Sequence, residues 1–313
     1  MGEALGDFLL AIRGEVAALV AAFLWAVSTV VFARLGKQLS PLVLNVAKGL
    51  VALCLIGLTL ALGKIAAAGV DSLAIALLLA SGIIGIGLGD TAYFASLNHL
   101  GARRALLMET LAPPLAALMA LVGLGETLSP AAWVGIFLTV GGVSWVISER
   151  VPGTSAPQGQ VVQGVGFGLL AAIGQAAGAV LSRAALADTA VSPLWSTLLR
   201  LFGGLLIMVS LLVWVQPRLE GTQGSVGYQL GLLRTRAVLG GVAIAAFLGT
   251  YLGIWLQQTA LKYASTGIAQ SLTSTSPLFI LPIAVALGDR VSLRAILGVL
   301  VALVGVWLLI GAG

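Results

Sequence analysis

Residues 73–97 read LAIALLLASGIIGIGLGDTAYFASL, an apolar run that contains a single charged side chain, Asp90. A helix needs about 20 predominantly apolar residues to cross the hydrocarbon core of a bilayer. A transmembrane strand would instead alternate apolar and polar residues over about ten positions. Because this stretch is apolar throughout, it predicts a transmembrane helix and excludes a strand of a barrel.

The composition of the whole chain extends this pattern. Of its 313 residues, 59% are hydrophobic and 9% are charged, and the mean hydropathy is +1.11. Soluble domains carry roughly 25% charged residues, so a soluble enzyme of this size is excluded. The apolar runs predict ten spans, at residues 15–35, 41–63, 73–97, 103–124, 130–148, 164–186, 193–215, 237–261, 265–287 and 292–312.

Two polar stretches interrupt the apolar runs, at residues 149–163 and 216–236. The first lies near the middle and divides the chain into a five-helix repeat at 1–148, a linker at 149–163 and a second five-helix repeat at 164–313. The net charge is +5, but the basic residues are scattered, which argues against nucleic-acid binding. The single cysteine, Cys54, excludes a disulfide framework and is expected to be a small buried residue.

The two halves match at nearly constant offsets. An offset of 152 carries Ser40-Pro41 onto Ser192-Pro193 and Lys48 onto Arg200. An offset of 164 aligns Gly85 with Gly249 and Gly89 with Gly253. An offset of 163 aligns proline, acidic and glycine positions: Pro114 with Pro277, Glu126 with Asp289 and Gly135 with Gly298. Because five is an odd number of crossings, the copies would enter the membrane in opposite orientations. We therefore predict an all-α polytopic membrane protein with ten transmembrane helices in two inverted five-helix repeats.

Four ionisable residues stand out because they lie well inside the predicted spans, where such groups usually face the bundle interior or a wet cavity. Lys48, Asp90 and Glu109 lie at similar depths from one face, so a pair of Lys48 with either carboxylate is geometrically allowed. The pair is either a static link between helices or a relay in which a carboxylate binds and releases a proton. Asp90 is the preferred coupling residue, because Glu109 is close enough to the interface to be solvated.

Arg200 is expected at the equivalent depth on the opposite side, with no buried anion beside it. Under one hypothesis it receives a carboxylate or phosphate of a substrate. Under the other it reaches the nearer membrane surface, or is satisfied by carbonyls and glutamines such as Gln258 and Gln270.

Four aromatic residues lie near the middle of their spans: Trp25, Tyr93, Tyr251 and Trp255. They either line a pocket or pack in the core. Prolines in the fourth and ninth spans are expected to kink them and to free backbone carbonyls. We find no metal-ligand cluster, nucleotide-binding loop or hydrolase motif, so the chain is predicted not to be an enzyme and to need no metal or other cofactor.

Residues 96–147 contain a short basic turn, a proline-bearing helix, the turn GETLS at 125–129 and a glycine-rich helix. Residues 260–310 repeat this order with GDRVS at 288–292, and Trp25 to Thr29 add a tryptophan-containing segment in the first span. This pattern resembles the EamA-type carriers of the drug/metabolite transporter (DMT) superfamily. The resemblance implies ten helices, a central cavity lined by both halves, and export or exchange of small metabolites such as amino acids.

The resemblance also implies that both termini are cytoplasmic. Basic residues argue the other way, because four lie on the side of the termini (Arg13, Lys64, Arg183 and Lys262) and ten in the opposite loops (Arg34, Lys37, Arg103, Arg104, Arg150, Arg218, Arg234, Arg236, Arg290 and Arg294). The positive-inside rule would place the termini outside.

The sequence thus predicts a multi-pass protein of the cell (inner or plasma) membrane that transports a small organic solute by alternating access. Its expected partners are the small-molecule substrate, the lipid bilayer and protons as the coupling ion, with no nucleic acid. A monomer is consistent with the sequence. The alternative is a sensor or scaffold that uses the same bundle without transporting.

Overall fold

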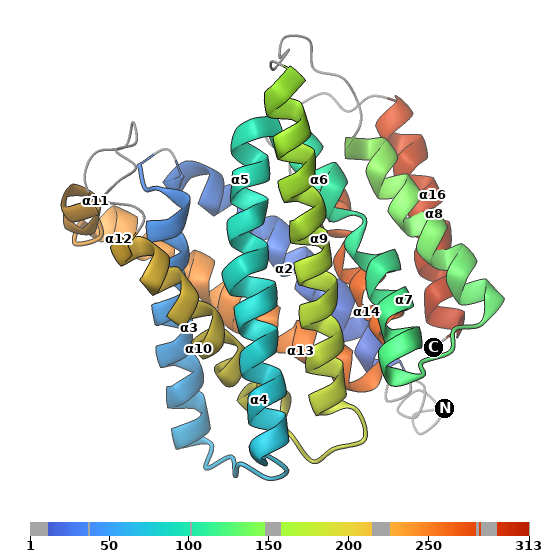
Figure 1. The fold of residues 1–313 in the computed structure, drawn as a ribbon, viewed down its shortest axis with the longest axis horizontal. Helices are drawn as coiled ribbons and strands as arrows, with labels where there is room; N and C mark the ends of the chain where they lie inside the picture. The colour runs from blue at the N-terminus through green and yellow to red at the C-terminus, as the bar shows by residue number, and fades with distance from the viewer. Residues whose placement is uncertain are drawn as a thin grey trace.

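The computed structural model describes residues 12–36, 38–100, 102–147, 158–214, 226–279, 282 and 293–312. The ordered elements in these ranges are all helical, and none of them is a strand (Figure 1). The first repeat contains α2 (Arg13–Leu35), α3 (Pro41–Leu62), α4 (Ser72–Ser81), η1 (Gly82–Gly89), α5 (Asp90–Leu100), α6 (Ala102–Glu109), α7 (Ala112–Leu124) and α8 (Pro130–Ile147). The second contains α9 (Gln158–Leu186), α10 (Pro193–Trp214), α11 (Val226–Leu232), α12 (Arg236–Ala245), η3 (Ala246–Leu252), α13 (Gly253–Tyr263), α14 (Thr266–Thr273) and α16 (Leu293–Ala312).

Eight helical segments of the described chain are long and apolar enough to cross a membrane, and α8 adds a shorter apolar helix. The expected span at 265–287 lies partly outside the described residues. Two boundaries differ from expectation. Helix α9 begins at Gln158, inside the predicted linker, and the polar stretch at 216–236 contains the short helix α11.

The third helix of each repeat carries a π-helical segment that the apolar pattern did not predict. Segment η1 separates α4 from α5, and η3 separates α12 from α13. The offset of 164 that aligns their glycines also aligns the segments, since it carries 82 onto 246. Glycine permits close packing here, because a Cβ atom on Gly178 of α9 would lie 3.0 Å from the Cα atom of Gly85. π-Helical turns are rare and often occur at functional sites.

The prolines of the fourth and ninth spans stand at helix breaks, as the sequence predicts. Helix α6 ends at Glu109 and α7 begins at Ala112, immediately before Pro113. Helix α14 ends at Thr273, four residues before Pro277. A proline has no N–H, so the carbonyl four residues before it loses its usual helical donor.

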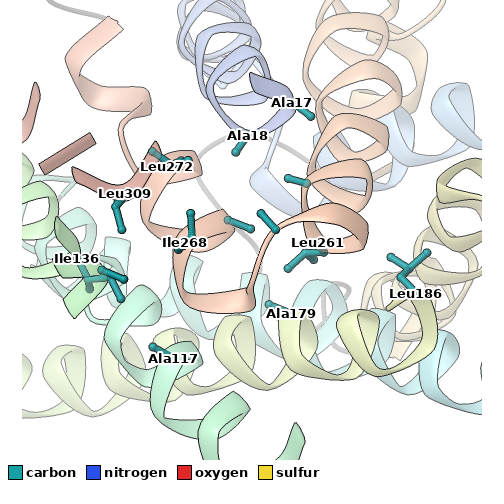
Figure 2. Packing of buried hydrophobic residues seen from close by; sticks show 14 of the residues in the cluster. Ala17, Ala18, Ala117, Ile136, Ala179, Leu186, Leu261, Ile268, Leu272 and Leu309 are labelled. Atoms are coloured by element: carbon teal, nitrogen blue, oxygen red, sulfur yellow. The ribbon is translucent and has the colours of Figure 1, made fainter. Parts of the chain in front are cut away.

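We call the end of the bundle where α2 begins and α13 ends the terminal end, and the end where α9 begins the linker end (Figure 1). An apolar cluster from α2, α7, α9, α13 and α14 packs near the terminal end, and Ala18, Ala117 and Ile268 are among its members (Figure 2). The expectation for Cys54 was wrong, because its side chain is exposed on the bundle surface. An apolar membrane protein can place such residues against lipid, so hydrophobicity did not reveal which face of α3 is buried.

Candidate functional site

A cavity of about 540 Å³ lies between helices of both repeats. It brings together all four ionisable residues that the sequence placed inside spans, which are Lys48, Asp90, Glu109 and Arg200. Uncharged polar side chains complete much of the lining: Ser28, Thr29, Asn45, Thr110, Gln175, Thr250, Gln257, Gln270, Thr273, Ser274 and Ser276. The cavity is therefore a polar compartment inside an otherwise apolar bundle.

Lys48 lies in α3, one turn beyond Asn45, and its side chain is half-buried at the cavity wall. Its Nζ atom lies 5.0 Å from the centre of the Phe32 ring, a favourable cation–π geometry. In the described part of the chain the one ion pair within 4.0 Å joins Arg183 to Glu126. The direct pair of Lys48 with Asp90 or Glu109 that the depths allow is therefore absent from this conformation.

Arg200 in α10 is almost fully buried, with 1% of its surface exposed. Its Nη1 donates to Ser182 Oγ at 3.4 Å, and its Nε meets no acceptor among the described residues. The expectation that Arg200 lies away from the other charges was wrong, because Asp90 is within electrostatic range and lines the same cavity. The depth estimate along single helices could not account for tilt and rotation, which bring these side chains together.

Asp90 is the first residue of α5, directly after the π-helical segment η1. Its Oδ1 accepts a hydrogen bond of 3.0 Å from Gln175 Nε2 of α9. Both Lys48 and Arg200 are within electrostatic range of its carboxylate. Asp90 thus shares the cavity with the cations of both repeats and accepts a hydrogen bond from an amide of the second repeat.

The predicted aromatic and amide residues divide into two groups. Trp25, Tyr93 and Gln270 line the cavity, and Trp25 Nε1 donates to the carbonyl of Gly249 at 2.7 Å. The other three, Tyr251, Trp255 and Gln258, are not among its lining residues.

Tyr251 and Trp255 belong to an apolar cluster with α3 and α10, where the Tyr251 hydroxyl contacts Thr59 Oγ1 at 2.9 Å. Gln258 is fully buried and donates to Ser182 Oγ at 3.3 Å. Helical spacing showed that Tyr251 and Trp255 share a face, but not that this face meets apolar neighbours.

The helix breaks of both repeats border the cavity. Glu109, Thr110 and Pro113 line it from the first break, and Thr273 and Pro277 from the second. Their prolines deprive the carbonyls of Glu109, Thr110 and Thr273 of the usual helical donor. Irregular backbone of this kind is tolerated at membrane depth where it lines a cavity. The breaks therefore place carbonyls that lack their usual helical donor in residues that line the cavity.

Sequence reasoning missed Gln175, the residue that contacts Asp90. A signal was present, because Gln175 is an amide in the middle of the apolar span of α9. Asn45 was missed as well, and it stands one helical turn before Lys48. Uncharged amides in membrane spans are candidates for the same reason as charges, since their polar groups need partners.

An all-helical bundle with a two-repeat polar cavity defines a multi-pass integral membrane protein. The model of the EamA-like transporter family matches residues 12–148 and 162–311, so the chain belongs to this family of the DMT superfamily. It is therefore of the membrane-transporter type rather than an enzyme.

Solved structures give the same fold. One crystal structure is 16% identical, superposes with a TM-score of 0.77, and the match covers 94% of this chain and 95% of that chain. At this identity the likeness concerns the fold alone. No curated protein matches the chain.

Proposed function

We propose that the protein is a secondary transporter that moves a small organic solute by alternating access, with the central cavity as the solute site. The observation that carries this proposal is the cavity itself, since it gathers charged and polar side chains from both repeats. Charged groups are costly inside a bilayer, and those that face a cavity commonly mark the path of a solute or an ion. The proposal includes ten spans in two inverted repeats, which would let the cavity face each side in turn.

The charges of the cavity favour a small dipolar solute, such as an amino acid. Two cations, Lys48 and Arg200, stand with two carboxylates, Asp90 and Glu109, so the ionised wall has no net charge. A ligand that carries both a carboxylate and an ammonium group would complement both signs without adding net charge. Arg200 Nε and Gln270 Nε2 are buried donors without an acceptor among the described residues. The carboxylate of such a ligand could accept hydrogen bonds from both.

The carboxylates are the proposed coupling groups. Asp90 is the first candidate, because it touches Gln175 and is influenced by both cations. In this mechanism a proton on Asp90 would weaken its attraction for the cations and change which conformation is favoured. Glu109, at the first helix break, is the second candidate. The direction of transport would be export or exchange across the cell membrane.

A proteoliposome assay tests the proposal. Purified protein is reconstituted, and uptake of radiolabelled amino acids, other organic acids and amines is measured with and without a pH gradient. Flux of at least one solute that depends on the protein supports a carrier, and stimulation by the gradient supports proton coupling. Saturable binding without flux would instead support the sensor or scaffold, and absence of both would overturn the assignment of the cavity.

A further inference from the structure

A second polar cluster lies outside the cavity, at the terminal end of the bundle. Arg183, near the end of α9, pairs with Glu126 of the α7–α8 turn, with Nε and Oε1 2.5 Å apart. Arg183 Nη1 also donates to the carbonyls of Leu261 and Lys262 at 2.9 and 2.7 Å. The second oxygen of Glu126 accepts the backbone N–H of Thr266 at 2.8 Å. We call these two side chains and their three backbone partners the terminal clamp.

The clamp joins the two repeats. Glu126 belongs to the first matched region, whereas Arg183 and its backbone partners belong to the second. One guanidinium therefore binds the last carbonyls of α13, and one carboxylate binds the first turn of α14. The side chains of Arg183 and Glu126 are only 17% and 15% exposed, so solvent weakens the pair less than it weakens a surface pair.

Apolar packing lies beside the clamp. A Cβ atom on Gly267 of α14 would lie 2.7 Å from the Cβ atom of Ala117 of α7, so the two helices are in close contact. Ala18, Ala117, Ala179 and Ile268 belong to the apolar cluster of this region (Figure 2). Small side chains and a charge-assisted clamp together close the bundle at this end.

The cavity extends further toward the opposite end. Phe32, Asn45 and Leu106 line it within about 6 Å of helix length from the linker-side ends of α2, α3 and α6. On the terminal side, Gln270 lies about 6 Å of helix length from the start of α14. Arg200 and Trp25 lie about 10 and 18 Å from the starts of α10 and α2. In these helices the lining thus comes close to the linker-side end at three positions and to the terminal-side end at one, while the clamp lies at the terminal end.

We propose that Glu126 and Arg183 form the terminal gate of the carrier, and that their contact must open before the cavity can face the terminal side. This inference rests on the proposed function. The gate is separate from the solute site, because neither residue lines the cavity. Its opening would release the C-terminal end of α13 and the N-terminal end of α14 together, since one ion pair holds both.

Accessibility labelling tests the gate without a known substrate. A single reporter cysteine, Gln257→Cys, is introduced into a Cys54→Ser background and labelled with a membrane-impermeant thiol reagent from each side of oriented vesicles. Glu126→Gln keeps an acceptor for Thr266 but removes the charge. We expect the rate of labelling from the terminal side to rise roughly tenfold. Loss of one charge-assisted contact that is made only in the closed state shifts the equilibrium toward the open state by about this factor. Unchanged labelling from that side would overturn the proposal.

Asp71→Asn is the matched control. Asp71 is another acidic residue at the terminal end, where it accepts the N–H of Ala74 at 2.7 Å within its own helix. Because this contact joins no two helices, the variant should label like the parent. A rise as large as that of Glu126→Gln would show that loss of any charge at this end loosens the bundle, and would contradict a specific gate.

A crosslinking experiment tests the same gate in the opposite direction and does not depend on the stability of Glu126→Gln. Cysteines replace Glu126 and Arg183 in the Cys54→Ser background and are joined by a short bis-methanethiosulfonate reagent, which forms a disulfide with each thiol, releases a sulfinate each time and is cleaved by a reductant. Joining them should abolish terminal-side labelling of a third cysteine at Gln257, and cleavage should restore it. Persistent labelling in the joined state overturns the gate. If the protein transports solute but its terminal-side labelling changes neither with Glu126→Gln nor with the crosslink, the gate alone is refuted. Absence of solute flux in the parent protein refutes the carrier.

Discussion

Lys48 and Arg200 occupy matching positions in the two repeats, yet their surroundings differ. Lys48 is half-buried at the cavity wall, with its ammonium group over the Phe32 ring. Arg200 is 1% exposed, and its backbone packs against Gly82 of η1 so closely that a Cβ atom there would overlap its carbonyl oxygen. The repeat thus preserves a cation at each position, but only the second copy is almost fully buried in tight packing, from which we infer a more constrained side chain. A rigid guanidinium loses little entropy on binding an oxyanion, so Arg200 is the better anchor.

The largest effect is expected at Arg200. Replacing it by glutamine removes the buried charge and the proposed partner of a substrate carboxylate. We expect solute affinity in the uptake assay to fall roughly a hundredfold, equivalent to about 3 kcal/mol. Arg234→Gln, an exposed arginine at the linker end, is the control and should behave like the parent. An Arg200→Gln protein with unchanged rate and affinity would exclude Arg200 from the solute site.

The packing of Arg200 predicts the next effect. Gly82→Ala would force η1 away from α10, at a cost of about 1–3 kcal/mol. We expect a fall of several degrees in the Tm of the detergent-solubilised protein and weaker solute binding. Gly57→Ala in α3 is the control, because a Cβ atom there meets nothing within 4 Å. Equal Tm values for the two variants would show that the close contact at Gly82 does not position Arg200.

Lys48→Gln is expected to have a smaller effect. Lys48 has no carboxylate within 4.0 Å and is only half-buried, so we expect its loss to cost about 1 kcal/mol, or roughly fivefold in affinity. Lys64→Gln, outside the cavity lining, is the control. If Lys48→Gln proved as damaging as Arg200→Gln, the two repeats would contribute equally, and the proposed asymmetry would be wrong.

The smallest effect concerns Ser182, whose hydroxyl oxygen accepts from Arg200 and from Gln258. Both hydrogen bonds are long, at 3.4 and 3.3 Å, so Ser182→Ala should reduce solute affinity about threefold. Ser210→Ala provides the comparison, because its hydroxyl donates only to the carbonyl of Leu206 in its own helix. A Ser182→Ala protein that binds as tightly as the parent would mean that packing alone orients Arg200.

Much of the fold was predictable, because several of its causes are local. Pro113 and Pro277 stand at the helix breaks, since a missing N–H acts at the proline itself. Gly85 and Gly178 permit a close contact between η1 and α9, as a pattern of small residues suggests. The π-helical segments did not follow from the apolar pattern. Their glycines Gly82 and Gly249 lie in close contact with Arg200 and Ser28 of other helices, which no local pattern reveals.

The candidate site was predictable only in part. The four charges inside the spans were identifiable because each is costly in lipid. The sequence did not reveal that they share one cavity, or that Gln175 donates a hydrogen bond to Asp90. Tyr251 and Trp255 satisfy the same helical spacing as cavity residues, yet they pack against α3 and α10.

By itself, the sequence determined that this protein is a bundle of membrane helices and that Lys48, Asp90, Glu109 and Arg200 need an explanation. Both follow from the cost of placing polar groups in hydrocarbon, which each segment must meet with its own hydrogen bonds. Only the tertiary structure decided that these charges share one cavity and that Glu126 and Arg183 form an ion pair at the terminal end of the bundle. The rotation and tilt of each helix are set by contacts with residues distant in the chain, and no local pattern specifies them.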